Sequence, residues 1–574
     1  MIFRVAVAMF FVAGWQNTQA QPAGGGTAAP VAKGAAEVPG APVKGKYKIP
    51  AKALGIWTHR VAVSNPKIAM AAPFDGGVMI EAAASGHVTL AASDAFGHTA
   101  AVDAVISAKG KFTVKVTKNT GGFIDAQLHH GAKGDGVADD TAAIQDALDA
   151  AKPGGTVYLG PGIYKASILV MREGVTLEMF TTMTDAKKGF TSELAVAARS
   201  GAITVLSGPR IRNNGHNLPG RDGSSHFTIR GGLIDVLNAG RAPLILGTAD
   251  GVLVENVIFK DIKGNHVIQV TGCSNTTIRN CMFAGYTVGD VFTREMVQVE
   301  VSTPGATGAP PNAPLTYDAG EFNFSKNIEI SGCYFGKSDK CGAPLIAIGH
   351  HSRNGAATVT GFRIVNNVFD EVLYSAIRYC NIVDTQISGN TFVSTSKHMN
   401  TTAFPGKAVT PAFIIIYMAE GVTKYPNIVN GATVTKALEA ENSGTRNLLI
   451  KNNTFNIGAG SDKKIIHASG SGLTEGLAFS ASLLRQDQYD KNPYSFSGYT
   501  ANSNVISGLA LEDNAINMGG QPAYADCFMF LSRVNNLKIA NNTCRLRAAF
   551  SATTGGVPGI YTSDCKSGAD AARR

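Results

Sequence analysis

The six-residue stretch IVNNVF at residues 364–369 decides the fold, because its pattern recurs from residue 229 to residue 544. ISGNTF at 387–392 and IKNNTF at 450–455 repeat its apolar first position, its asparagine at the fourth position and its phenylalanine at the sixth. Self-similarity of this kind indicates a solenoid, in which each copy forms the same part of one coil.

Nine copies of the pattern align along the chain, and consecutive starts lie 23 to 63 residues apart. The short steps fit one coil of a solenoid. The long steps fit either one coil with an inserted loop or two coils with a degenerate copy between them. The copies start at Ile229, Val254, Ile278, Ile330, Ile364, Ile387, Ile450, Leu511 and Ile539.

The fourth and sixth positions of the pattern carry the structural signal. Asparagines stacked at a bend can bond to the coils on either side through their amides, and asparagine tolerates the left-handed backbone of tight bends. The sixth position is mostly Phe or Ile, which predicts an inward apolar stack. Such a registered column predicts a parallel β-helix rather than a β-sandwich. The fourth positions are Gly232, Val257, Cys281, Cys333, Asn367, Asn390, Asn453, Asn514 and Asn542.

A single helix is predicted at the start of this solenoid, within HHGAKGDGVADDTAAIQDALDAA at residues 129–151. Asp139 and Asp140 are good N-cap residues, and an apolar stripe then follows one face of a helix over 140–152. The end of a solenoid exposes apolar core and unpaired strand edges. The amphipathic helix is therefore predicted to cap the N-terminal end.

The remaining N-terminal sequence divides into three parts. Residues 1–20 contain an early cation, Arg4, an apolar run too short to span a membrane, and small residues before a cleavage point, as in a secretory signal peptide. Residues 21–46 are rich in Ala, Gly and Pro and read as a linker. Residues 47–119 alternate as in a small β-rich module, and residues 120–574 form the β-helix domain. These features predict an exported protein, periplasmic or extracellular, without a membrane span.

The charge balance bears on the partner. The formal net charge is +9 with 16% charged residues, and the sequence has no run of Lys and Arg. A nucleic-acid partner would require such clustering, so none is predicted. A diffuse positive field suits an acidic polysaccharide. The sequence leaves the oligomeric state open.

Candidate site residues come from aligning three strands by their central apolar residues: NHVIQV at 265–270, EMVQVE at 295–300 and SAIRYC at 375–380. In this alignment, Ile268, Val297 and Ile377 point into the core. Gln269, Gln298 and Arg378 then point outward in one column. Asp318 and His350 come from adjoining segments. The predicted outward cluster comprises His266, Gln269, Glu295, Gln298, Glu300, Asp318, His350 and Arg378.

The segment HGAKGDGVADDTAAIQDALDAAKPGGTVYLGPGIY at residues 130–164 resembles the pectate-lyase-like superfamily, which includes rhamnogalacturonase- and epimerase-like proteins. The resemblance implies a right-handed parallel β-helix over about residues 120–550 and a carbohydrate-related role. The chain lacks the Asn-Thr-Asp, Asp-Asp, Gly-His-Gly and Arg-Ile-Lys motifs that polygalacturonases share; Gly349-His350-His351 is one of the nearest echoes. The resemblance therefore leaves the activity open.

Hydrolysis of an acidic polysaccharide is the first functional hypothesis. Glycosidic cleavage requires one protonated and one ionised carboxyl group beside the scissile bond, and no cofactor. The catalytic candidates are Glu300, paired with Asp318 or Glu295, together with His350. The predicted substrate-binding residues are His266, Gln269, Gln298 and Arg378.

Two alternatives stay open. A polysaccharide lyase or uronate C5-epimerase would remove the C5 proton with Arg378 or His350 supplying charge or base, and calcium would be held by Asp290, Glu295 and Glu300. A non-catalytic surface solenoid would bind glycan without turnover. The sequence does not assign a metal site.

Overall fold

The computed structural model describes most of the repeat pattern and the module before it. The described residues are 41–94, 98–119, 122–180, 204–213, 223–235, 242–287, 295–300, 325–350, 359–380, 382–395, 412–417, 424–429, 432–437, 445–458, 461, 464–469, 506–518, 529–532, 534–546, 560–563 and 566–567. The predicted signal peptide, residues 21–40 of the predicted linker, Asp290 and Asp318 lie outside these residues.

Two compact units make up the chain. The first contains the residues up to Gly134, together with Asp140–Gly160 and Val175–Glu178. The second contains Asp135–Asp139, Pro161–Gly174 and the chain from Met179 onward.

The first unit begins with two antiparallel sheets that enclose one core, which confirms the small β-rich module. Ile80 and Val88 are among the core residues contributed by the two sheets. One sheet has the order β1 (Pro42–Ile49), β4 (Gly77–Ala84), β3 (Ala69–Phe74). The other has the order β2 (Arg60–Val63), β5 (Gly86–Ser93), β6 (Thr99–Ile106), β7 (Phe112–Asn119), and the short helix α2 (Ala51–Leu54) precedes β2.

The first strand starts earlier than the sequence indicates. β1 begins at Pro42, inside the predicted linker 21–46, and pairs antiparallel with β4 from Pro42 opposite Ala84 to Ile49 opposite Val78. Composition alone hides this strand, because its Gly, Pro and Lys residues resemble those of a linker. The pairing with β4 supplies the hydrogen bonds that composition does not reveal.

The rest of the first unit contains the predicted helix and the first strands of a parallel stack. The helix is α4 (Thr141–Ala150), somewhat shorter than the predicted 140–152, and Ile144, Ala147 and Leu148 form its buried stripe. α4 packs beside α3 (Ala126–His130), and α3 contacts β8 (Phe123–Asp125) and β10 (Thr156–Leu159). β13 (Thr176–Met179) also starts in this unit. Asp140 precedes the helix, but its carboxylate accepts hydrogen bonds from the backbone N–H groups of Lys133 and Gly134 instead of capping α4.

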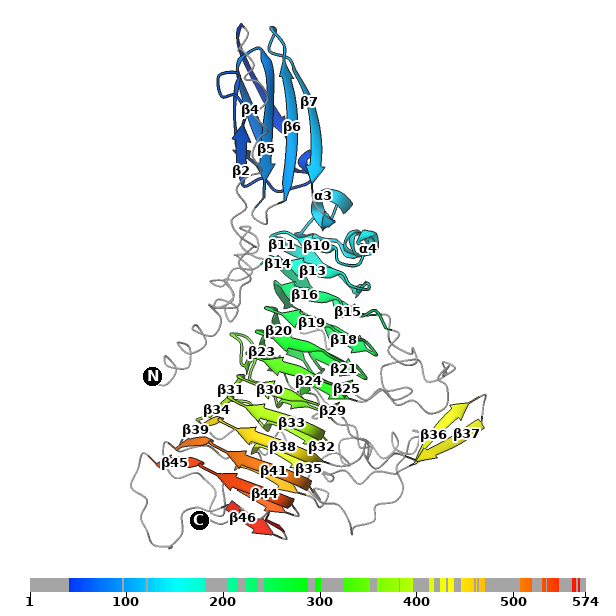
Figure 1. The fold of residues 1–574 in the computed structure, drawn as a ribbon, viewed down its shortest axis with the longest axis vertical. Coiled ribbons are helices and arrows are strands. Elements are labelled where there is room, and N and C mark those ends of the chain that lie inside the picture. Colours follow the sequence, from blue (N-terminus) through cyan, green and yellow to red (C-terminus); the bar gives the residue numbers. More distant parts are fainter. Residues whose placement is uncertain are drawn as a thin grey trace. The chain divides into compact units, whose positions relative to one another are not determined.

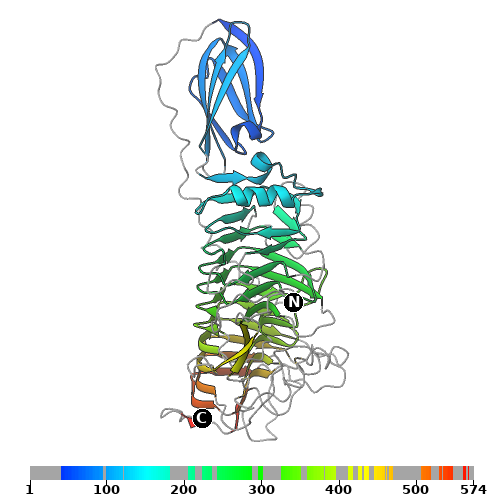
Figure 2. The same ribbon diagram turned by 90° about the vertical axis from the view of Figure 1, so that its right-hand side faces the viewer.

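The second unit is a stack of parallel strands in three sheets, as Figures 1 and 2 show. Sheet I contains β16 (Thr228–Gly231), β19 (Leu253–Glu255), β22 (Thr277–Arg279), β26 (Glu329–Ser331), β30 (Arg363–Val365), β33 (Ile382–Ser388), β38 (Arg446–Lys451), β41 (Ile506–Glu512), β44 (Val534–Ala540) and β47 (Lys566–Ser567). Sheet II contains β9 (Asp135–Asp139), β11 (Gly162–Lys165), β14 (Thr204–Ser207), β17 (Leu233–Asp235), β20 (Ile258–Lys263), β23 (Met282–Thr287), β27 (Tyr334–Gly336), β31 (Val368–Asp370), β34 (Thr391–Ser394), β39 (Thr454–Ile457), β42 (Ala515–Met518) and β45 (Thr543–Leu546).

Sheet III contains β12 (Ile168–Val170), β15 (Arg210–Arg212), β18 (Leu244–Gly247), β21 (Ile268–Thr271), β24 (Glu295–Glu300), β28 (Ile346–Gly349), β32 (Ser375–Cys380), β35 (Ala412–Tyr417), β40 (Lys464–Ser469), β43 (Met529–Ser532) and β46 (Ile560–Ser563). Each coil passes through sheets I, II and III in turn, as β19, β20 and β21 do. Two short strands, β25 (Ser325–Lys326) and β29 (Val359–Thr360), pair beside sheet I, and β36 (Lys424–Val429) with β37 (Ala432–Ala437) forms an antiparallel hairpin. The predicted parallel β-helix is confirmed.

The predicted register of the nine copies is also confirmed, strand by strand. The first positions pair directly from Ile229 opposite Val254 through to Leu511 opposite Ile539. Consecutive copies are therefore always neighbours in sheet I. Every long step in the sequence is one coil with an insertion, and none contains a degenerate coil.

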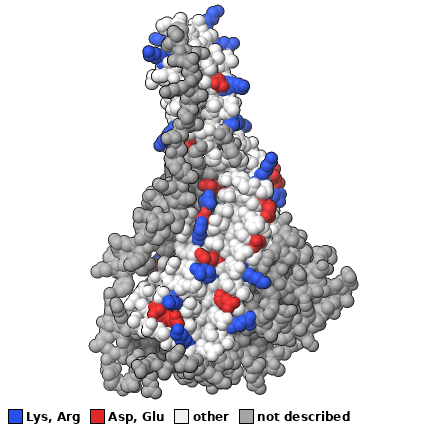
Figure 3. Space-filling view, viewed as in Figure 1, with Lys and Arg blue, Asp and Glu red and all other residues white. Residues whose placement is uncertain are grey.

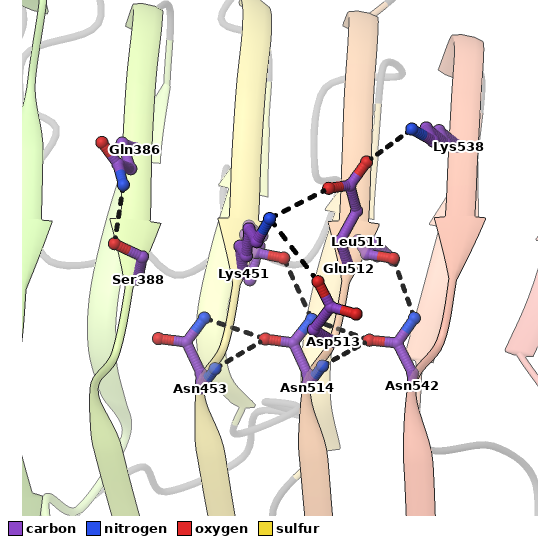
Figure 4. Close-up of polar contacts among 11 residues, drawn as sticks. Gln386, Ser388, Lys451, Asn453, Leu511, Glu512, Asp513, Asn514, Lys538 and Asn542 are labelled. Atoms are coloured by element: carbon purple, nitrogen blue, oxygen red, sulfur yellow. Dashed lines mark hydrogen bonds and ion pairs between the residues drawn. The ribbon is translucent and has the colours of Figure 1, made fainter.

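The fourth-position asparagines, from Asn367 to Asn542, form a continuous hydrogen-bonded ladder inside the bend between sheets I and II. The amide of Asn453 donates to Oδ1 of Asn514 at 3.0 Å, and that of Asn514 donates to Oδ1 of Asn542 at 2.8 Å (Figure 4). Each amide also donates to the first-position carbonyl of the preceding coil, as Asn453 does to Ile387. The thiol of Cys333 makes the same contact to Ile278 O, at 3.6 Å. From Asn367 to Asn542 the ladder thus ties each coil to the next through side chains as well as backbone.

The left-handed backbone of this bend lies at the third position, and at the fourth position only where Gly232 occupies it, which corrects the sequence-based expectation. Asn280 (φ 52°), Asn366 (φ 56°) and Asn452 (φ 54°) occupy third positions, and glycine occupies others. The fourth-position asparagines do not have positive φ. Their role is therefore side-chain bonding, and backbone tolerance selects the residue before them.

The sixth positions form the predicted inward stack. Phe283 and Phe335 stack with ring centroids 4.6 Å apart, and Phe392 and Phe455 with centroids 4.7 Å apart. All four rings are fully buried. Offset stacking adds to the burial of apolar area, so this column and the asparagine ladder beside it fix one face of each coil.

Candidate binding and catalytic site

The residues predicted to share a column do share one in sheet III. Gln269 lies opposite Gln298, and Ile268 lies opposite Val297. Between Gln298 and Arg378 the structure inserts one coil that the sequence alignment omitted, β28, which contributes Gly349 to the column. A coil whose position in the column is glycine has no side chain to align, so the pattern gave no signal for it.

The column is buried rather than open, contrary to the predicted outward cluster. Glu295 and His350 are 0% exposed, and Gln298 is 1% exposed. Glu300, His266 and Arg378 are also buried, and only Gln269 is partly exposed. Strand alternation predicts which side chains leave the core, but it does not predict what covers them.

A buried ion pair between Glu295 and Arg378 dominates this cluster. Arg378 Nη2 donates to Glu295 Oε1 at 2.7 Å and to the carbonyl oxygen of His350 at 2.9 Å. Gly349 makes room for this contact, because a Cβ at that position would lie 3.1 Å from Glu295 Cγ and 2.6 Å from Arg378 O. The cation stabilises the buried charge of the carboxylate, and removing either partner would leave an uncompensated charge.

The two histidines take different places around the pair. His266 Nδ1 lies 2.9 Å from the carbonyl oxygen of Glu295 and 3.5 Å from its Oε2. The ring of His350 stacks on Tyr379 with centroids 5.1 Å apart. His350 therefore meets Arg378 through its main chain and Tyr379 through its ring.

Glu300 is held separately, at the end of β24. Gln298 Nε2 donates to Glu300 Oε1 at 2.6 Å, and the main-chain carbonyl of Glu300 accepts from Ser325 Oγ at 2.6 Å. Burial raises the pKa of the nearby Tyr379 hydroxyl, and the negative charges of Glu295 and Glu300 raise it further. Tyr379 is thus a neutral group near the carboxylates of Glu295 and Glu300.

Metal ligation was left open by the sequence. Within the described part of the chain, no group of three or more His, Cys, Asp and Glu side chains is arranged to hold a metal ion. Asp290 and Asp318, which the calcium and hydrolase hypotheses use, lie outside that part.

A second buried charged cluster escaped the sequence reasoning. Lys260 Nζ lies 2.7 Å from Asp339 Oδ1 and 3.7 Å from Asp261 Oδ2, and Ser338 Oγ donates to Asp261 Oδ1 at 2.5 Å. These residues belong to β20 and to a segment 77 positions later, and no repeat position marks either one. The cluster joins an inserted segment to sheet II.

The outer face of sheet I carries a row of alternating charges. Figure 3 shows positive and negative side chains side by side along the visible face of the β-helix. Glu255 lies 2.7 Å from Arg230 Nε and 2.6 Å from Arg279 Nη2, and Lys538 Nζ lies 2.9 Å from Glu512 Oε1. The charges are largely neutralised by one another, so this face does not present a strong field of one sign.

Comparison with known proteins supports the class that the strand pairing defines, a parallel β-helix protein with a pectate lyase-like N-terminal segment. Residues 123–189 match the family model described as rhamnogalacturonase A/epimerase, pectate lyase-like. The resemblance predicted from residues 130–164 is thereby confirmed.

Two named bacterial proteins are similar to larger parts of the chain. Plasmin and fibronectin-binding protein A of Streptococcus pneumoniae is 32% identical over 300 residues, which cover 46% of this chain and 38% of the relative. The structure of the Streptococcus pneumoniae surface protein and adhesin PfbA covers 77% of this chain and 100% of its own, at 20% identity and a TM-score of 0.48. The structure of a family 28 exopolygalacturonase of Yersinia enterocolitica covers 86% of this chain and 85% of its own, at 11% identity and a TM-score of 0.38.

Among the described residues, no helix combines sufficient length with sufficient apolar character to cross a bilayer.

Proposed function

We propose that this protein is an exported polysaccharide-binding protein, in which the β-helix is a scaffold and the polar column of sheet III stabilises that scaffold. The observation that carries the proposal is the carboxylate of Glu295, fully buried and paired with Arg378. A glycosidase acid must hold a proton at the substrate, and a nucleophile must reach the sugar. A buried carboxylate paired with a guanidinium suits neither role. The cation stabilises its ionised form, and burial separates it from substrate.

Two further observations support binding. The relative that matches over 300 residues is named for binding plasmin and fibronectin. The net charge of +9 suits an acidic ligand, which favours a uronate or sulfated polysaccharide for this chain.

A binding isotherm and a product assay on the same samples test the proposal. The full chain is incubated with polygalacturonate and, separately, with neutral dextran, and reducing ends, unsaturated termini and uronate composition are measured over a long incubation. The expected result is saturable binding of polygalacturonate without any product. Saturated reducing ends would indicate a hydrolase, unsaturated termini a lyase, and altered uronate composition an epimerase; each would overturn the proposal.

Hydrolysis is the second candidate, and the contact between Gln298 and Glu300 favours it. A carboxylate positioned by an amide at 2.6 Å resembles an oriented catalytic group. Glu295 and Glu300 stand five positions apart on β24, about 16 Å between Cα atoms, so Glu295 is a poor partner for Glu300 in a carboxylate pair. The substitution Glu300→Gln, with turnover of polygalacturonate as the readout, separates this candidate from binding alone.

A further inference from the structure

The cationic excess of the chain is concentrated in the sandwich of the first unit. Residues 41–119 contain ten Lys and Arg against four Asp and Glu, whereas the whole chain contains 51 against 42. All ten cations are exposed. Of the four acids, Asp94 is buried and bonded to His98. The positive field is therefore local, and it is not the diffuse field that the overall composition indicates.

Four of these lysines lie on the two segments that touch where β1 lies against the turn between β6 and β7. A Cβ on Gly45 would lie 3.0 Å from Gly110 O and 3.1 Å from Phe112 Cε2, so the two segments touch through their backbones. This close approach places the backbone of the two lysines that flank Gly45 beside that of the two that flank Gly110. We name this surface the β1–β7 seam, and its members are Lys44, Lys46, Tyr47, Lys109 and Lys111.

The acids near the seam neutralise it only in part. Lys46 Nζ lies 2.6 Å from Glu81 Oε1, and both side chains are more than half exposed, so the pair is weak. Among the described residues, Lys44, Lys109 and Lys111 form no ion pair. Like charges gathered on one edge repel each other, and an anionic ligand would relieve that repulsion.

An exposed aromatic side chain lies at the same edge, on the face of β1 opposite to Lys44 and Lys46, because Tyr47 is the cross-strand neighbour of the core residue Ile80. The Tyr47 ring stacks on Phe112 with centroids 5.4 Å apart, and Tyr47 is 38% exposed. Because β1 is an edge strand, a polysaccharide lying along this edge can stack a sugar ring on Tyr47 while its carboxylates reach lysines on either side of the edge. Trp57 is equally exposed, at 39%, but it lies outside the seam, and its Nε1 donates to Asp125 Oδ2 at 2.8 Å.

We propose that the β1–β7 seam is a binding site for an acidic polysaccharide, with the lysines contacting carboxylate or sulfate groups and Tyr47 contacting a sugar ring. The choice of ligand rests on the proposed binding function, but the location does not. Polysaccharide is favoured over nucleic acid because the seam presents one exposed aromatic ring, whereas single-strand binding uses a series of them.

Two charge-matched variants of the full chain test the location. The seam variant is Lys44→Gln, Lys109→Gln and Lys111→Gln, and the control variant is Lys52→Gln, Lys67→Gln and Lys118→Gln, which removes the same charge from exposed positions in the same unit. Binding of polygalacturonate is measured at low salt, with neutral dextran beside it. We expect the seam variant to bind about tenfold more weakly and the control variant to stay within about twofold of the unchanged protein. The affinity of the seam variant for polygalacturonate should also fall less steeply as the salt concentration rises.

The substitution Tyr47→Ala probes the stacking contact, with Tyr47→Phe as its conservative partner. We expect Tyr47→Ala to weaken binding at high and low salt alike and Tyr47→Phe to retain it. Thermal melting of each variant verifies that the sandwich remains folded.

The outcomes separate the two proposals. If the unchanged protein binds no acidic polysaccharide, both fail. If it binds and the two triple variants weaken equally, overall charge carries binding and the seam is not a site. If neither triple variant changes, the ligand binds elsewhere and only the seam proposal is overturned. Single-stranded DNA bound as tightly as polygalacturonate, and equally weakened in the seam variant, would assign the seam to nucleic acid instead.

Discussion

The bend between sheets I and II and the column in sheet III stabilise overlapping stretches of the solenoid in different ways: the asparagine ladder runs from Asn367 to Asn542, and the column runs from β21 to β32. At the bend, one residue type repeats, and each asparagine makes the same contacts as the next. In sheet III, unlike residues from four coils meet once, around Glu295 and Arg378. The repeated ladder spreads its stabilisation over many coils. The column concentrates it in one buried pair, so single substitutions there should cost more.

Arg378→Met is expected to have the largest effect. It leaves the carboxylate of Glu295 buried without its cation, which costs about 3–5 kcal/mol of unfolding free energy. Urea titration of the substituted protein measures the loss. Adding Glu295→Gln should restore much of it, because the buried charge is then gone. A loss below about 1 kcal/mol for Arg378→Met alone would mean that the column is not a point of concentrated stability.

Asn453→Ala is expected to have the next largest effect. The substitution leaves the carbonyl oxygen of Ile387 and the amide of Asn390 without a ladder partner, at a cost of about 1–3 kcal/mol. Asn517→Ala is the matched control, since the amide of Asn517 donates to Asn456 at 3.0 Å in a partly exposed position. Equal losses of unfolding free energy for the two would contradict a special role for the buried ladder.

These two sites also show how much the sequence could predict. The register of all nine copies follows from residues that repeat, such as Ile364 and Phe369, because the same contact in each coil requires the same type of residue. The place of Gly349 in the column could not be predicted, because its contribution is the absence of a side chain. It also placed Gln298 and Arg378 on an open face, since strand alternation describes direction and not coverage. The third-position bend was missed because Asn and Gly occupy two adjacent positions, and only the backbone angles separate their roles.

Cys333→Asn tests whether the ladder can be extended by one coil. An amide at this position would donate to Ile278 O, as the amide of Asn367 donates to Ile330 O at 2.9 Å. A neutral hydrogen bond in place of a weak thiol contact should raise the unfolding free energy by about 1 kcal/mol. The melting temperature and urea midpoint should both rise. A decrease in both would mean that the larger side chain does not fit, and that the ladder ends at Asn367 for steric reasons.

Lys538→Ala should have the smallest effect. Its ion pair with Glu512 lies on the outer face of sheet I, where water screens the charges (Figure 4). The expected loss is less than about 0.5 kcal/mol, and it should shrink further in high salt. A larger loss, insensitive to salt, would mean that the outer row of charges stabilises the coils as strongly as the buried ladder does.

The most direct test of a structural rather than catalytic column is the chemical accessibility of its carboxylates. Carbodiimide-driven labelling of the native protein, read by mass spectrometry, compares Glu295 with the exposed carboxylates of Glu81 and Asp75. We predict that Glu81 and Asp75 are labelled in the native protein and that Glu295 is labelled only after denaturation. Labelling of native Glu295 at the rate of Glu81 would show a carboxylate open to solvent and substrate, and would contradict the account.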